Sequence, residues 1–206
     1  MKTIAHILSY VFHPLLMATY GVALALSFTY LAMYPASIKL LILGGVFVVT
    51  GVIPAVFILL LVHNGAAGDI ELTDGKDRVI PYLIFIVAIL LCLFFLYKMM
   101  MPFWLLAMLM GACLALIIAL AINFSWKISA HSIGIGGLLG GIMGLARIHG
   151  INPYWAFIFV LLIAGAVGTS RIILNKHTTG QVFAGFGLGF VCTFVASLLS
   201  FIYLFI

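Results

Sequence analysis

Two short polar segments hold most of the side chains in this chain that could do chemistry. The first runs from Phe124 to His131, and the second runs from Ser170 to His177 and is followed by Gln181. Only 6% of the residues are charged, so this concentration of cations and imidazoles is informative. Arginine, lysine, histidine and hydroxyl side chains bind phosphate oxygens and move protons near them. The two segments therefore predict a phosphate site.

Phosphoryl transfer without a metal ion requires donors around three phosphate oxygens, an in-line nucleophile and an acid for the leaving oxygen. A histidine can be the nucleophile when an acceptor holds its other ring nitrogen and fixes the tautomer. Gln181 lies one helical turn after His177, so its amide oxygen can accept the imidazole N–H. An amide supplies no negative charge to an imidazolium, so a weak enzyme and a non-catalytic phosphate binder both agree with glutamine here.

The second segment resembles a motif of the type-2 phosphatidic-acid phosphatase family, which includes bacterial lipid phosphatases and shares its site with vanadium haloperoxidases. That family's third motif is Ser-Arg, five residues, His, three residues, Asp. Ser170, Arg171 and His177 match it, and Gln181 stands in place of the aspartate. Divergent Bacteroidetes members of the family have similar segments.

The first segment is similar to the family's second motif, Pro-Ser-Gly-His, because Ser129 and His131 keep the serine and histidine at the same spacing. The first motif, Lys, six residues, Arg-Pro, is not matched, since Glu71 stands where its lysine would precede Arg78. The resemblance covers the last 80 or so residues well and the first half poorly. It implies a phosphatase-like core at 79–205 within a single integral membrane domain, 1–206.

The resemblance also implies a role for each matched residue. His177 would attack phosphorus and form a phosphohistidine, and His131 would protonate the leaving oxygen. Arg171 would clamp phosphate oxygens, while the Ser129 hydroxyl and the Ala130 backbone N–H would donate to them. This mechanism requires no metal and no cofactor.

Three further cations are candidates to replace the lysine of the missing first motif. They are Lys127, Lys76 and Arg78. This substitution is an inference from the residues and is not part of the family's pattern. Two other histidines, His13 and His63, lie at the ends of apolar runs near the same membrane face and are secondary candidates.

The elements that must position these residues are membrane-spanning helices. The chain has 206 residues, 67% of them hydrophobic, with a mean hydropathy of +1.40, and roughly 20 apolar residues span a bilayer as a helix. We therefore predict an all-α, polytopic bundle of six to seven helices, with kinks at Pro14 and Pro54. The apolar runs lie at about 8–32, 38–62, 79–98, 102–123, 132–148, 152–169 and 178–205.

Counting helices places the polar loops at 63–78, 124–131 and 170–177 on one membrane face, because two helices separate each loop from the next. The opposite loops contain Lys39, Lys98 and Arg147 without an acid, which favours the cytoplasm for that face. We expect a bacterial inner (cytoplasmic) membrane protein whose site faces the periplasm.

Small residues support close packing of the helices that follow the two segments. Gly136, Gly140 and Gly144 follow His131 at intervals of four, and Gly185 and Gly189 follow His177 in the same way. Such spacing lets membrane helices approach closely. We expect this approach to bring the two histidines within reach of one phosphate.

All four acidic residues, Asp69, Glu71, Asp74 and Asp77, fall in the loop at 63–78. Carboxylates of this kind hold Mg²⁺ in prenyltransferases and CDP-alcohol phosphotransferases, which bind diphosphates. Those families require a second cluster or further aspartates downstream, and this chain has none after Asp77. The metal-dependent alternative is therefore ranked last.

The favoured function is a membrane phosphatase acting on a lipid phosphate or diphosphate, with the lipid bilayer as its surroundings and no nucleic-acid partner. One alternative keeps the fold and is a phospholipid-binding or transport-related protein without turnover. Another is an anion transporter or channel, which basic residues in mid-helix would favour. The particular lipid and the oligomeric state are left open by the sequence.

Overall fold

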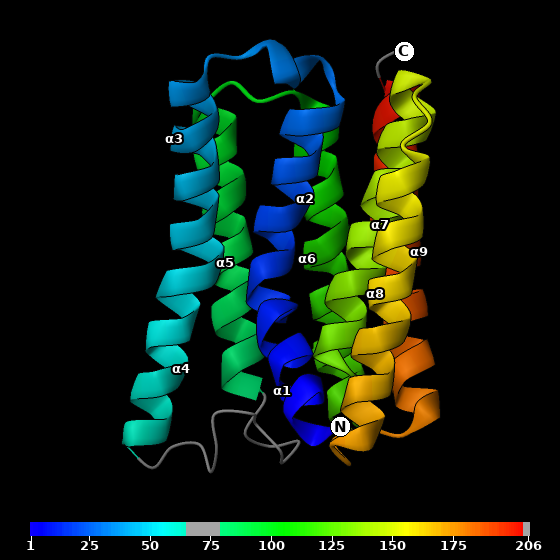
Figure 1. Cartoon of the computed structure of the whole chain (residues 1–206). Coiled ribbons are helices and arrows are strands. Elements are labelled where there is room, and N and C mark those ends of the chain that lie inside the picture. Colours follow the sequence, from blue (N-terminus) through cyan, green and yellow to red (C-terminus); the bar gives the residue numbers. More distant parts are fainter. Residues whose placement is uncertain (65–78, 204–206) are drawn as a thin grey trace.

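Helices account for nearly all of the described structure, which comprises residues 1–64 and 79–203 of a computed structural model (Figure 1). No strand occurs within these two ranges. The elements are α1 Lys2–Val11, α2 Pro14–Phe28, the 3₁₀ helix η1 Tyr30–Met33, α3 Ala36–Phe47, the π-helical turn η2 Val48–Val52, α4 Ile53–His63, α5 Val79–Lys98, α6 Phe103–Asn123, α7 Ala130–His149, α8 Tyr154–Ile173 and α9 Thr179–Tyr203.

Six helical segments are long and apolar enough to cross a membrane, and the bent pair formed by α1 and α2 gives a seventh if it counts as one span. The joined segment Ala36–His63 is one of the six, and α5 to α9 provide the others. The prediction of an integral membrane protein with six to seven apolar helices is confirmed in this form.

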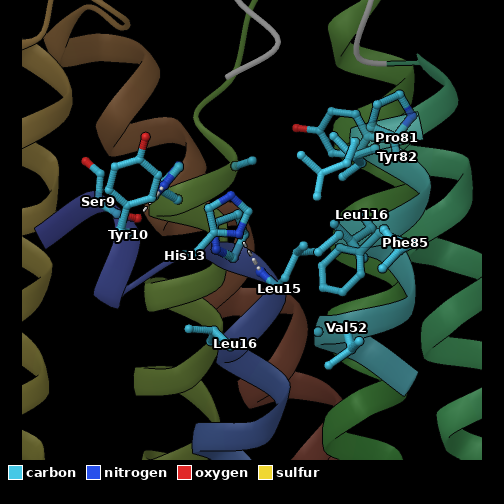
Figure 2. Close-up of a pocket in the computed structure, with 18 of the residues that line it drawn as sticks. Ser9, Tyr10, His13, Leu15, Leu16, Val52, Pro81, Tyr82, Phe85 and Leu116 are labelled. Atoms are coloured by element: carbon cyan, nitrogen blue, oxygen red, sulfur yellow. Dashed lines mark hydrogen bonds between the residues drawn. The ribbon is translucent and has the colours of Figure 1, made fainter. Parts of the chain in front are cut away.

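The first span is broken where the sequence predicts a kink. Pro14 is the first residue of α2, and the axes of α1 and α2 differ by 56°. A proline fits the first helical turn because it has no N–H to leave unpaired. His13 caps α2, and its Nδ1 accepts the backbone N–H of Leu15 at 3.4 Å (Figure 2). The helix begins at Lys2, earlier than the predicted run.

Pro54 produces a π-helical turn within the second span. Because Pro54 has no N–H, the regular ladder of hydrogen bonds cannot continue through it. The Ile53 N–H instead bonds to the carbonyl of Val48, five residues back. This turn, η2, joins α3 to α4 without interrupting the span.

Helices α7 and α9 make the closest contact in the bundle, and their glycines are the reason. A Cβ on Gly136 would meet the carbonyl of Phe186, and one on Gly189 would meet the carbonyl of Ile133. The Thr193 hydroxyl crosses the interface and donates to the Gly137 carbonyl at 2.9 Å. The predicted close approach of these two helices is confirmed.

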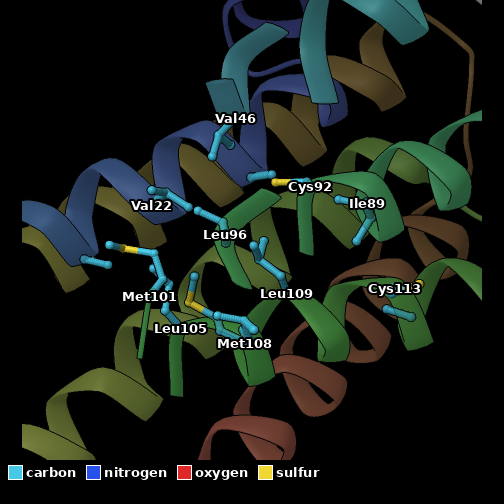
Figure 3. Packing of buried hydrophobic residues seen from close by; sticks show 14 of the residues in the cluster. Val22, Val46, Ile89, Cys92, Leu96, Met101, Leu105, Met108, Leu109 and Cys113 are labelled. Carbon is cyan, nitrogen blue, oxygen red and sulfur yellow. The ribbon is translucent and has the colours of Figure 1, made fainter. Parts of the chain in front are cut away.

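Helices α2, α3, α5 and α6 form a second packed region around a large apolar core (Figure 3). Val22, Val46, Cys92, Leu96 and Leu105 are all fully buried in it. This core fixes the N-terminal helices against α5 and α6, and α2 also packs against α7. The N-terminal half is therefore an integral part of the bundle that holds the polar segments.

The turns at 124–129 and 174–178 lie at the same end of the bundle, together with the end of α4 and the beginning of α5 (Figure 1). The N-terminus also lies at this end. The loops η1 to α3, α5 to α6 and α7 to α8 lie at the other end. The predicted sharing of one face is thus confirmed for the two motif-bearing turns.

Candidate phosphate site

A cavity of about 570 Å³ reaches the residues at the motif-bearing end of the bundle. His13, His131, Arg171 and His177 line its polar part. Apolar side chains from α2, α4, α5 and α6 line the rest (Figure 2). They include Leu16, Val56, Leu59, Phe85 and Leu116. The cavity therefore has one end lined by cationic and hydrogen-bonding side chains, and its remaining wall is lined by apolar side chains.

The turn between α8 and α9 fixes Arg171 relative to His177. Asn175 adopts a left-handed conformation with φ of 54°, which asparagine tolerates better than most residues. The Lys176 N–H then bonds to the Arg171 carbonyl at 3.0 Å, and the His177 N–H reaches the same carbonyl at 3.3 Å. This Schellman-type helix end explains the five-residue spacing between the arginine and the histidine. Both side chains are buried, at 3% and 7% exposure.

Gln181 fixes the tautomer of His177. Its Oε1 lies 3.1 Å from His177 Nδ1 and accepts the Thr178 backbone N–H at 3.1 Å. The Thr178 hydroxyl accepts the Gln181 N–H at 3.4 Å, which completes a capping box at the start of α9. Since Oε1 can only accept, His177 Nδ1 donates to it, and Nε2 retains a lone pair. His177 is thus in the tautomer that a nucleophile requires.

His131 is held by the N-terminal helix. Its Nε2 lies 3.1 Å from the Ser9 carbonyl, so this nitrogen carries a proton and donates it. His131 and Ala130 stand at the first turn of α7, and both line the cavity. The backbone N–H groups at a helix N-terminus attract anions.

Ser129 has a structural role in this arrangement. It is fully buried and caps α7, where its oxygen accepts the Ser132 N–H at 3.3 Å and the Ser132 hydroxyl at 2.9 Å. The Ser129 N–H donates to the Gln181 carbonyl at 3.4 Å, which links the two motif segments. Ser129 is not among the residues that line the cavity.

No protein-family model, curated protein or solved structure matches this chain. The resemblance to type-2 phosphatidic-acid phosphatases accordingly depends on the two motifs, whose side chains Arg171, His131 and His177 share one cavity.

The other cations predicted for the site take no described part in it. Lys127 is half-buried and does not line the cavity. Lys76, Arg78 and the four acidic residues lie outside the described residues. His63 is exposed at the end of α4 and is not a lining residue. Within residues 1–64 and 79–203, no group of three or more His, Cys, Asp or Glu side chains is placed to hold a metal ion.

The N-terminal helix and the break that follows it contribute residues to the cavity that the two motifs do not include. His6, Ser9, Tyr10 and His13 all line it, and the His13 ring meets the His131 ring edge-on at 5.3 Å between centroids. The sequence contains a signal for this group, because positions 6, 9, 10 and 13 are spaced as one face of a helix. A polar stripe on an otherwise apolar segment marks a face turned toward a polar site.

Proposed function

We propose that the protein is a membrane lipid phosphatase that hydrolyses a lipid phosphate or diphosphate through a phosphohistidine, in a phosphatidic-acid-phosphatase-like fold. The observation that carries this proposal is the cavity itself, in which Arg171, His131 and His177 occupy the polar end. A guanidinium, a nucleophilic imidazole and a second imidazole are the groups that metal-independent phosphoryl transfer requires.

In the first step, Nε2 of His177 attacks phosphorus, and the bond between phosphorus and the leaving lipid oxygen breaks. This step requires a His131 that is protonated on both nitrogens: it keeps Nε2–H on the Ser9 carbonyl and gives its Nδ1 proton to the leaving oxygen. In the second step, neutral His131 takes a proton from water, whose oxygen attacks phosphorus. The N–P bond breaks, phosphate leaves and His177 is restored.

The apolar wall supports a lipid rather than a soluble phosphate ester. The cavity extends from Arg171 and His177 along side chains of α2, α4 and α5, including Leu16, Val56 and Phe85. Burial of hydrocarbon contributes about 0.8 kcal/mol for each CH₂ group. A phosphate on an alkyl or prenyl chain would place its phosphate at the polar end and its hydrocarbon against the apolar side chains. A sugar phosphate would leave those apolar side chains in contact with water.

The orientation is proposed from charge. Lys39, Lys98 and Arg147 lie toward the end of the bundle opposite the cavity, where the loops contain no acid. The motif-bearing loops hold more cations, but a phosphate site requires them in either orientation. We therefore take the three cations at the opposite end as the topological signal, which favours the cytoplasm for that end. The cavity of a bacterial inner-membrane protein would then face the periplasm.

The second candidate function is phosphate or phospholipid binding without turnover. Gln181 favours it, because an amide holds the His177 tautomer but supplies no negative charge to the imidazolium that forms during transfer. This candidate uses the same cavity and the same donors.

Phosphate release from a panel of lipid phosphates and diphosphates, in detergent with EDTA, tests the first proposal. We expect release by the wild type and a loss of at least ~10³-fold in His177→Ala. His63→Ala is the matched control, because His63 is exposed at the same end but does not line the cavity. No release from any lipid by a folded protein would favour binding without turnover, and release only with Mg²⁺ would contradict the mechanism.

A further inference from the structure

The break between α1 and α2 places a buried hydroxyl with no partner at the polar end of the cavity. Ser9 is only 6% exposed and lines the cavity, and its Oγ has no hydrogen-bond partner in the described parts of the chain. Buried polar groups in native proteins are nearly always hydrogen-bonded, and an exception calls for an explanation. The Oγ atom is closed off from solvent in its present rotamer, and rotation about the Ser9 Cα–Cβ bond would turn it toward a ligand in the cavity, which would supply the missing acceptor.

His13 presents a second donor from the same break. Its Nδ1 accepts the Leu15 N–H, so the neutral ring carries its proton on Nε2. The ring lies edge-on against His131. Figure 2 shows His13 among the residues that line the cavity. Ser9 lies in the last turn of α1 and His13 caps α2, so the two donors stand on either side of the break, and both residues line the cavity.

The cavity has few other sources of positive charge. Arg171 is the only lysine or arginine among its described lining residues. A phosphate monoester carries up to two negative charges and three oxygens that need donors. The Arg171 guanidinium and the backbone N–H groups at the N-terminus of α7 supply some of these donors. Both belong to the C-terminal half of the chain.

We propose that the Ser9 hydroxyl and the His13 Nε2–H bind the phosphate group and complete its cradle from the N-terminal side. These two donors would take the place of the phosphatase family's first motif, which this chain does not match. The assignment depends on the phosphate site proposed above, but it does not depend on turnover. It makes the α1–α2 break a ligand-binding element of this protein.

Binding of orthovanadate to the full chain in detergent, measured by titration calorimetry, tests the assignment. We expect Ser9→Ala to weaken binding about tenfold to a hundredfold, as loss of one hydrogen bond to a charged group does. Its melting temperature should not fall, because the Ser9 hydroxyl has no protein partner to lose. Ser27→Ala is the control, since Ser27 is exposed in α2 and its hydroxyl donates to the Ala23 carbonyl within its own helix.

Two variants separate the donor of His13 from its packing. His13→Phe keeps a ring against His131 but removes the donor, and we expect it to weaken vanadate binding about tenfold. His13→Gln supplies an amide N–H, and it should bind more tightly than His13→Phe. Wild-type affinity in both Ser9→Ala and His13→Phe would overturn the proposal, and wild-type affinity in one would remove that residue from it.

The wild-type protein distinguishes this assignment from the proposed activity. If it binds vanadate through Ser9 and His13 but releases no phosphate from any lipid, the cradle stands and the catalytic function falls. If it binds no vanadate, the cradle is overturned.

Discussion

At the scale of single residues, the site depends on how each imidazole is held. His177 has a side-chain acceptor, Gln181, that also belongs to a capping box, whereas His131 has a backbone acceptor, Ser9. The capping role alone would account for a glutamine at position 181. Substitutions at this position are therefore informative about its second role, the contact with His177.

Gln181→Glu and Gln181→Met separate these two roles. Glutamate keeps both acceptor contacts and adds a negative charge, so we expect faster phosphate release than in the wild type. Methionine has a similar length but no acceptor, so release should fall by ~10²-fold or more through loss of the tautomer. Methionine should also reduce the free energy of unfolding by about 1 kcal/mol through loss of the cap. Equal release by all three proteins would exclude a catalytic role for position 181.

At the scale of elements, the α7–α9 pair places the two motif histidines at one cavity. The two helices approach so closely that several glycines face backbone atoms of the partner helix. Side-chain bulk at those positions would separate the helices and with them His131 and His177. Gly187, also in α9, does not have this constraint.

Gly189→Ala and Gly187→Ala test this difference within one helix. A Cβ at Gly189 would collide with the Ile133 carbonyl, whereas a Cβ at Gly187 meets nothing within 4 Å. Overpacking of this kind costs about 1–3 kcal/mol. We expect thermal unfolding in detergent to show a lower melting temperature for Gly189→Ala and an unchanged or higher one for Gly187→Ala. Equal melting temperatures would contradict the close approach.

The sequence predicts the elements better than it predicts the site. The glycine spacing predicted the α7–α9 contact, and the break at Pro14 was expected, because both are local patterns. The contact of His131 with Ser9 joins residues 122 positions apart, and no local pattern indicates such a pairing. Lys127 was a candidate for the cation of the missing first motif, but it does not line the cavity.

At the scale of the whole molecule, all turns that carry motif residues lie at one end of the bundle (Figure 1). Single cysteines test this arrangement and the orientation together. We expect a membrane-impermeant thiol reagent, applied from the periplasmic side, to label Ser125→Cys and Thr179→Cys but not Met33→Cys. All three positions are exposed, and Met33 lies at the opposite end. Labelling of Met33→Cys alone would reverse the orientation, and labelling of all three would contradict the shared face.

The acceptor that holds His131 is a main-chain carbonyl, and this has a consequence for evolution. Any amino acid at position 9 that permits the helix supplies the same carbonyl, so mutation there does not remove the contact. The partner of His131 can therefore persist through sequence drift without leaving a conserved side chain. In diverged descendants of this chain, the backbone of the helical turn before the Pro14 break would be retained for this contact whatever its side chains. The Ser9 and His13 side chains would be retained only where they still bind phosphate.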